Sequence, residues 1–287
     1  MQSRTDLALE QTGMFTNADG IAIRERGRVF KITEITIDSD AHGARIGKSM
    51  GRYLTLEAGR LSHFSQDYQA QVTELSMELR SFLPAGSVLA VGLGNSDITP
   101  DALGPDTAAK ILATRHLQTE LASDDADTRF LRELRPVSVL ANGVIGQSGM
   151  ETAELVTALR DTIKPQAILA IDALACSDLR RLGTTIQISD AGISPGSGVQ
   201  NSRKELSART LGVPVIAIGV PMVVDMYTIA AHYAGGNFGG DNDTLPNMMV
   251  TPRDIDKLLS HAAELLGAAI NLALHPQLTF EDVEALS

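Results

Sequence analysis

The sequence predicts an α/β fold, in which a mainly parallel sheet is flanked by helices. From residue 87 onward, short apolar runs rich in Val, Ile and Leu alternate with segments of helical spacing. This alternation is typical of a parallel sheet covered by helices. The chain has 287 residues, 44% of them hydrophobic, which is enough for a sizeable core. We expect a single domain over residues 1–287, with an N-terminal elaboration of the sheet.

The N-terminal part is expected to hold an exposed strand at Arg28–Ile37, where apolar and polar residues alternate, and a helix at Tyr68–Leu83. Residues Gly47–Gly59 are expected to form a loop with a short strand. The strands expected after these are Ser87–Leu93, Pro136–Ala141, Ala167–Asp172, Thr184–Ser189 and Pro214–Val220. The helices expected between and after them are Gly104–Gln118, Met150–Ile163, Asn201–Thr210 and Thr251–Leu274, with a Gly-rich loop at His232–Asn247.

Composition narrows the class of protein. The net charge of −11 argues against direct binding to nucleic acid, because a surface of this sign repels phosphate. A single cysteine, Cys176, permits no intrachain disulfide and fits a reducing compartment; we expect it to be a small buried apolar residue. We find neither a signal peptide nor an apolar stretch of ~18 residues. The sequence therefore predicts a soluble, cytoplasmic protein that does not enter a membrane.

Three aspartates follow predicted strands, at the sheet edge where α/β proteins place their functional sites. Asp97 and Asp101 come after the first strand of the alternating part, and Asp172 ends the third. The turn that holds the first two lacks the third glycine of a dinucleotide fingerprint, and its carboxylates would repel a pyrophosphate. The serine in Gly146–Met150 also misses the G-x-S-x-G elbow of serine hydrolases by one residue.

Asp101 and Asp172 are the best candidates for a catalytic pair. Two close aspartates do not both ionise readily, so one keeps a proton while the other acts as a base toward water. Such a pair could hydrolyse a peptide bond without a metal or a covalent intermediate. The alternative is that each aspartate caps the helix that follows it. The backbone N–H groups of Gly196, Ser197 and Gly198 could provide an oxyanion site, although a tight turn explains their glycines equally well.

Long segments of the chain resemble the germination protease family of spore-forming bacteria. The segments that carry the resemblance are "SRTDLALE" (Ser3–Glu10), "IGKSMGRYLTLE" (Ile46–Glu57), "VGLGNSDITPDALGP" (Val91–Pro105), "GVIGQSGMET" (Gly143–Thr152), "AIDALA" (Ala170–Ala175), "TTIQISDAGISPGSGVQNSRKELS" (Thr184–Ser207) and "LGVPVIAIGVPMVVD" (Leu211–Asp225). They are spread over nearly the whole chain.

The resemblance implies an atypical aspartic-type endopeptidase with a fold similar to that of the hydrogenase-maturation proteases (phosphorylase/hydrolase-like). The family's catalytic aspartates would correspond to Asp101 and Asp172. The family is made as a zymogen that removes its own N-terminus, and the corresponding cleavage lies between Asp6 and Leu7, which leaves residues 1–6 as a short propeptide. The resemblance also implies small acid-soluble spore proteins as substrates, a homotetramer, a place in the forespore or spore core, and no cofactor or metal.

Two alternatives stay open at this point. Because the hydrogenase-maturation proteases recognise nickel, Asp101 and Asp172 could be the ligands of a metal-dependent peptidase. The chain could instead bind spore proteins without cleaving them, although both aspartate motifs are intact.

Overall fold

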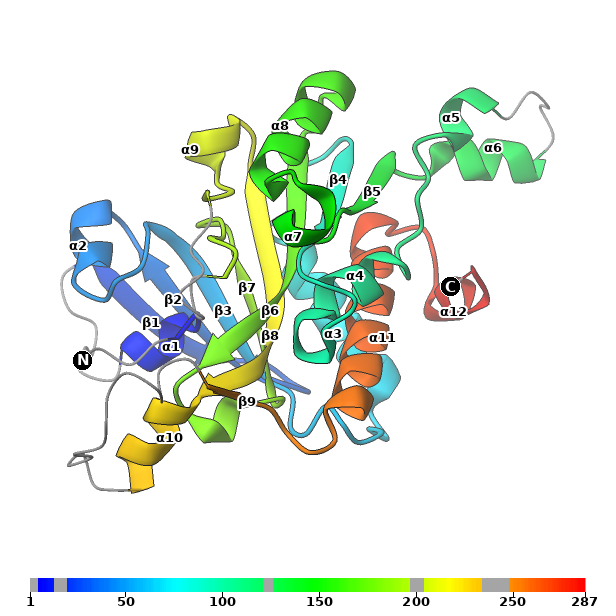
Figure 1. Cartoon of the computed structure of the whole chain (residues 1–287). Coiled ribbons are helices and arrows are strands. Elements are labelled where there is room, and N and C mark those ends of the chain that lie inside the picture. The colour runs from blue at the N-terminus through cyan, green and yellow to red at the C-terminus, as the bar shows by residue number, and fades with distance from the viewer. Residues whose placement is uncertain (1–4, 13–19, 121–125, 197–203, 234–247, 287) are drawn as a thin grey trace.

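The computed structural model describes residues 5–12, 20–120, 126–196, 204–233 and 248–286. In this part of the chain, nine strands form one sheet, which helices cover on both faces (Figure 1). The strand order is β1-β2-β3-β7-β8-β6-β4-β5, and β9 pairs with β8. The strands are β1 (Ile21–Arg26), β2 (Lys31–Ile37), β3 (Gly51–Glu57), β4 (Val88–Gly92), β5 (Val137–Ala141), β6 (Ala167–Cys176), β7 (Thr185–Ser189), β8 (Val215–Asp225) and β9 (Met249–Val250).

The α/β class is confirmed, and the sheet has two parts. Strands β5, β4, β6 and β8 run parallel to one another, as the alternation of apolar runs and helices predicts. Strands β7, β3, β2 and β1 extend this sheet through antiparallel pairings. The N-terminal elaboration thus joins the sheet itself, and the parallel arrangement is limited to four strands.

The helices of eight or more residues are α3 (Tyr68–Arg80), α6 (Ala126–Glu133), α8 (Thr152–Ile163), α10 (Met226–Tyr233) and α11 (Ile255–Leu274). The shorter ones are α1 (Ala8–Gln11), α2 (Asp40–Ala44), α4 (Leu103–Ala108), α5 (Leu117–Glu120), α7 (Ile145–Ser148), α9 (Ala208–Leu211), α12 (Phe280–Leu286) and the 3-10 turns η1 (Thr99–Asp101) and η2 (Leu179–Arg181).

The central strands bury both of their faces, because successive side chains of a strand point to opposite sides. In β6, Leu169 and Ile171 pack with α3, α4 and α11 in the larger core cluster. Ile168 and Ala170 pack on the other face, with Val156 of α8. This two-sided burial explains why the strands appear in the sequence as continuous apolar runs.

Two predicted helices are shorter than expected, because backbone groups in both segments form hydrogen bonds with other parts of the chain. The helix expected at Gly104–Gln118 is divided into α4 and the start of α5; between them, Thr114 and Arg115 donate their N–H groups to the Val137 carbonyl at the start of β5. The helix expected at Asn201–Thr210 is reduced to α9, because Leu206 pairs with Ile193 in an antiparallel bridge. Residues 201–203 of that segment lie outside the described residues, as do 234–247 of the expected Gly-rich loop.

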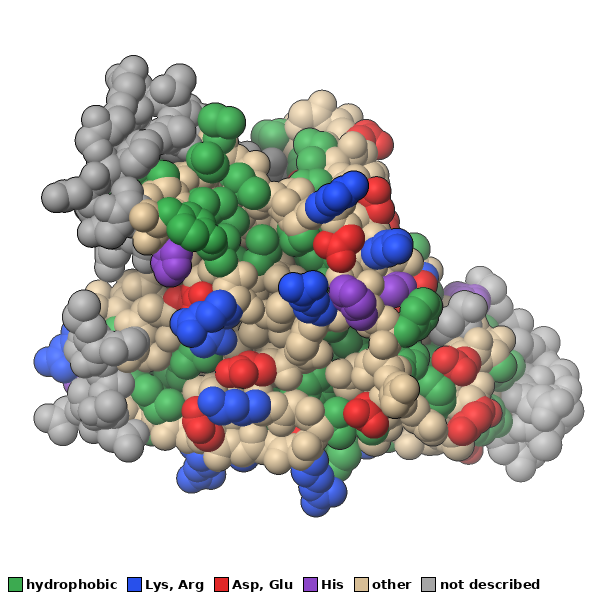
Figure 2. Space-filling view, turned by 90° about the horizontal axis from the view of Figure 1, so that it is seen from below, with side chains coloured by type: hydrophobic (Ala, Val, Ile, Leu, Met, Phe, Trp, Pro, Cys, Tyr) green, Lys and Arg blue, Asp and Glu red, His purple; other side chains and the backbone are tan. Residues whose placement is uncertain are grey.

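One face of the molecule, turned by 90° from the view of Figure 1, carries acidic and basic side chains close to one another over its middle and a group of apolar side chains at the upper left (Figure 2). No region of this face is covered by described basic side chains alone. None of the described helices is both long and apolar enough to cross a membrane.

Candidate active site

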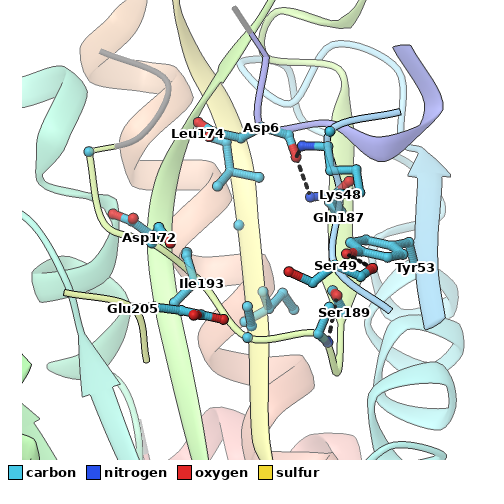
Figure 3. A pocket seen from close by; sticks show the side chains of 18 residues that line it. Asp6, Lys48, Ser49, Tyr53, Asp172, Leu174, Gln187, Ser189, Ile193 and Glu205 are labelled. Carbon is cyan, nitrogen blue, oxygen red and sulfur yellow. Dashed lines mark hydrogen bonds between the residues drawn. The ribbon is translucent and has the colours of Figure 1, made fainter. Parts of the chain in front are cut away.

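A pocket of about 220 Å³ opens where β6, β7 and β8 lie side by side (Figure 3). Strand β6 contributes Asp172 and Leu174, while β7 contributes Gln187 and Ser189. The rest of the lining comes from Asp6, Gly47–Ser49, Tyr53 of β3, Ala191–Ser194, Gly196, Glu205 and Ala217–Gly219 of β8. The pocket thus collects side chains from segments that are far apart in the sequence.

Asp172 lies within β6 rather than at its end. The strand was expected to stop at Asp172, but it continues to Cys176, because β8 also continues and pairs with it as far as Val224. The Asp172 side chain is only 6% exposed, and its Oδ1 accepts a hydrogen bond from the Ala173 N–H at 2.9 Å. Opposite Asp172 stands Gly219 of β8, where a Cβ would lie 2.3 Å from the Asp172 carbonyl oxygen. A glycine is therefore required beside this carboxylate.

Asp101 is the last residue of η1, in the connection that follows β4. It is half-buried, and its Oδ2 accepts a hydrogen bond from the Asn95 N–H at 2.8 Å. Gly94 has a φ of +114°, and a Cβ on it would lie 2.0 Å from the Asp101 carbonyl oxygen. The glycine turn after β4 therefore folds back closely onto Asp101 and determines where it sits. Asp101 is not among the described residues that line the pocket.

The segments that carry the two aspartates meet at one edge of β6. Leu93 donates its N–H to the carbonyl of Ile171, the residue before Asp172, at 2.8 Å. Gly104, just after Asp101, packs so closely that a Cβ there would lie 2.5 Å from the same Ile171 oxygen. The turn η1 also contacts both β6 and β8. Asp97 lies farther out: it is exposed and accepts a hydrogen bond from Gln147 at 2.8 Å.

The N-terminal segment continues along this same edge of β6. Asp6 donates its N–H to the Ala175 carbonyl at 3.0 Å, and the Ala175 N–H donates to Asp6 Oδ2 at 2.8 Å. Ala175 is four residues after Ile171, so both carbonyls face the edge that β4 occupies earlier along the strand. The Asp6 carbonyl accepts hydrogen bonds from Lys48 Nζ at 2.9 Å and from Gln187 Nε2 at 3.0 Å.

The residues after Asp6 are held firmly. Leu7 is fully buried and packs with Leu174, Cys176 and Val224. Glu10 accepts hydrogen bonds from the Ser177 N–H, the Ser177 hydroxyl and the Asp178 N–H, at 2.6–2.9 Å. The segment that contains the predicted cleavage site is therefore docked in the pocket that Asp172 lines.

Burial controls the protonation of groups around the pocket. Desolvation of the ammonium lowers the pKa of Lys48, and the nearby Asp6 and Glu10 carboxylates oppose that shift. Burial raises the pKa of the Tyr53 phenol, and Asp190 adds to the effect. Cys176 is fully buried, as expected, and burial raises the pKa of its thiol well above its usual range. A thiol held in its neutral form is a poor nucleophile.

Of the three residues predicted to form an oxyanion site, the structure describes only one. Gly196 lines the pocket at a φ of +73°, whereas Ser197 and Gly198 lie outside the described residues. Lys48 and Gln187 were missed as site residues, although both lie in segments that resemble the germination proteases. Gln187 is a large polar residue between Ile186 and Ile188 of β7, and such a residue within a buried strand was a signal that could have pointed to it. Within the described part of the chain, no three His, Cys, Asp or Glu side chains gather as metal ligands do.

Comparison with known proteins identifies the class of protein to which this chain belongs. The family model for germination proteases matches residues 3–236. A germination protease of Caldanaerobacter subterraneus is 38% identical over 99% of this chain and 97% of the relative. Those of Clostridium tetani and Bacillus subtilis are 37% and 36% identical, covering 99% and 97% of this chain and 99% and 95% of the relatives. Among solved structures, the [NiFe] hydrogenase maturation protease HycI of Thermococcus kodakarensis aligns with a TM-score of 0.36 and 17% identity, over 67% of this chain and 98% of that one.

The family model and the curated relatives define the chain as a peptidase, a hydrolase that acts on peptide bonds. The similarity to the curated relatives extends over nearly the full length of both partners. The chain belongs to the germination protease family.

Proposed function

We propose that this protein is an endopeptidase that begins the degradation of small acid-soluble spore proteins during germination, and that Asp101 and Asp172 together activate the attacking water. The observation that carries the proposal is that Asp6, the residue before the predicted cleavage site, lies in the same pocket as Asp172. A peptide segment in the pocket of a candidate catalytic carboxylate is what a self-processing zymogen requires. Residues 1–6 are then the propeptide of a single protease domain.

The surroundings of the two aspartates support their role as a pair. The β4 connection brings η1 against β6, and the bond from Leu93 to Ile171 ties the two aspartate segments together. One carboxylate in its ionised form takes a proton from water, and the other in its acid form polarises the scissile carbonyl before it gives a proton to the departing amine.

The way the N-terminal segment binds supports an extended substrate. The Asp6 N–H donates a main-chain hydrogen bond to the Ala175 carbonyl, and the Ala175 N–H is taken by the Asp6 carboxylate, so the segment binds along a sheet edge that an extended peptide could also use. A small spore protein that is unfolded when free of DNA can offer such a segment. The negative charge of the chain favours binding of the protein substrate rather than the nucleic acid. We further propose that the enzyme works as a homotetramer in the forespore or spore core, without a cofactor. Sedimentation of the purified protein tests the tetramer.

Digestion of a small acid-soluble spore protein, followed by mass spectrometry, tests the activity. The protein beginning at Leu7 is compared with its Asp101→Asn and Asp172→Asn variants, with and without a chelator. We expect cleavage after acidic residues that resists the chelator and is lost in both variants. Loss on chelation would instead make the carboxylates metal ligands. Cleavage that survives in both variants would reject the aspartate pair, and no cleavage by the parent would favour a binding protein.

A further inference from the structure

The carbonyl oxygen of Asp6 lies in a site with two hydrogen-bond donors. Lys48 Nζ approaches it at 2.9 Å and Gln187 Nε2 at 3.0 Å (Figure 3). Two donors at about 2.7–3.1 Å are the arrangement that stabilises an oxyanion during attack on a carbonyl. This oxygen belongs to the peptide bond between Asp6 and Leu7, which is the bond of the predicted cleavage.

Gln187 is fixed before any reaction takes place. It lies on β7 with only 8% of its surface exposed, and its Oε1 accepts the Ala8 N–H at 2.8 Å. Since one amide oxygen accepts from Ala8, the amide nitrogen is turned toward the Asp6 carbonyl. The side chain therefore holds the backbone on both sides of Leu7 and keeps the bond extended across the pocket.

Lys48 supplies a positive charge where negative charge would develop. Its ammonium also donates to the Thr5 carbonyl at 3.2 Å, so it is held by two consecutive carbonyls. Desolvation strengthens its attraction for an oxyanion, because the effective dielectric constant is lower than in water. The same desolvation lowers the pKa of Lys48.

We propose that Lys48 and Gln187 form the oxyanion site of this peptidase, and that they bind the carbonyl of the residue on the N-terminal side of the cleaved bond. The inference rests on the function proposed above and adds catalytic residues to it. It replaces backbone N–H groups of the Gly196–Gly198 segment as the main source of oxyanion stabilisation. It also removes the need for a protonated aspartate to polarise the carbonyl.

The step balances with the groups present. Water attacks the carbonyl carbon of Asp6, and its proton passes to the ionised carboxylate of the aspartate pair. The carbonyl electron pair moves onto the oxygen, which Lys48 and Gln187 stabilise. The electron pair on the oxyanion then re-forms the C=O bond as the C–N bond to Leu7 breaks, and the leaving nitrogen takes a proton from the carboxylic acid of the pair. The products are a carboxyl group at Asp6 and a free amine at Leu7.

Self-processing of the full chain tests this proposal, with the loss of residues 1–6 followed by mass spectrometry. We compare the parent with Lys48→Met, Lys48→Arg, Gln187→Leu and Asp172→Asn. Lys257→Met, on the exposed face of α11, is the matched control. We expect Lys48→Met to slow processing by about 10²–10³-fold and Gln187→Leu by about 10²-fold, the usual effect of losing one oxyanion donor. Lys48→Arg should recover part of the rate, and Lys257→Met should match the parent.

A second measurement separates catalysis from docking. Hydrogen exchange of the Asp6 amide, whose N–H donates to the Ala175 carbonyl and to neither substituted side chain, reports whether the segment stays in the pocket, where the Leu7 and Glu10 contacts should hold it. Slow processing with unchanged protection supports the oxyanion site. If processing slows only in proportion to lost protection, Lys48 and Gln187 merely dock the segment and the inference is wrong.

The same experiment distinguishes the inference from the function on which it rests. Parental rates in Lys48→Met and Gln187→Leu, together with no processing in Asp172→Asn, would overturn the oxyanion site and leave the aspartate proposal intact. If Asp172→Asn processes like the parent, or the parent does not process at all, the proposed function fails and the oxyanion site fails with it.

Discussion

Replacing Gly94 by alanine tests whether the position of Asp101 matters for catalysis. Gly94 has a φ of +114°, and a Cβ there would lie 2.0 Å from the carbonyl oxygen of Asp101. Ordinary contacts of a Cβ begin at 3.4 Å. The turn and η1 must therefore separate by about 1 Å or more, and misplacing a catalytic group by that distance lowers a rate by about 10²-fold.

The matched control is Gly59→Ala. Gly59 also has a positive φ, of +68°, but a Cβ on it would meet nothing within 4 Å. This variant carries backbone strain without displacing a neighbour, so it should lose about 1–2 kcal/mol of stability and no activity. Gly94→Ala should lose roughly 1–3 kcal/mol from its strained backbone and stay folded.

The assay is the turnover number for peptide cleavage, measured beside the thermal unfolding of each variant. We expect Gly94→Ala to fold cooperatively and to lose about 10²-fold in kcat, while Gly59→Ala keeps the parental kcat. If Gly94→Ala folds and cleaves as fast as Gly59→Ala, then Asp101 does not need its observed position. The assignment of Asp101 to the catalytic pair would then be refuted.

Three further predictions concern stability and reactivity. Burial lowers the pKa of His275 from 6.5 to about 4, so the unfolded chain binds a proton that the folded chain does not; the free energy of unfolding should fall by about 3 kcal/mol as the pH drops through this interval. Urea unfolding at pH 7 and pH 4.5 should show a smaller drop in His275→Leu, and an equal drop would contradict the assignment. The buried Cys176 thiol should resist a thiol reagent at pH 8 until the protein is unfolded. Rapid labelling of the native protein would contradict this prediction, because it would mean that the packing around Cys176 opens. Glu74 accepts the N–H groups of Arg28, Val29 and Phe30 at 2.7–2.9 Å, so Glu74→Gln should cost about 1–3 kcal/mol in urea unfolding, against little change for the exposed Glu281→Gln; similar values for the two variants would show that these bonds add no stability.

Local sequence patterns predicted the strands and helices whose structure depends on residues close along the chain. The apolar runs predicted β4, β5 and the greater part of β6 and β8, because a strand buried on both faces needs mostly apolar side chains. Strand β7 was predicted from Thr184–Ser189, in which polar and apolar residues alternate. The helical spacing predicted α3, α8 and α11 for a similar reason. It overstated α4, whose continuation was lost when Thr114 and Arg115 bonded to Val137. That competing bond involves a residue more than twenty positions away, and helical periodicity does not report it.

The same difference between local patterns and long-range contacts applies to the residues of the candidate site. Asp101 and Asp172 stood out because each follows an apolar run, and carboxylates after strands lie at the functional edge of such a sheet. Lys48 and Gln187 did not stand out, because the partner of both is the Asp6 carbonyl, a backbone group without a signature in the sequence. Backbone acceptors are identical at every position, so only the path of the chain decides which one a side chain meets.

By itself, the sequence determined the α/β class, the succession of strands and helices along its parallel core and the family to which its motifs belong. These depend on hydrophobic periodicity and on the spacing of residues that are close along the chain. Only the tertiary structure decided that the N-terminal segment pairs with the end of β6, that its carbonyl meets Lys48 and Gln187, and that Asp172 shares their pocket. Contacts of this kind join residues up to about 180 positions apart. They arise when the sheet is assembled, because β6 extends past the end of β4 and this part of its edge is open to the N-terminal segment.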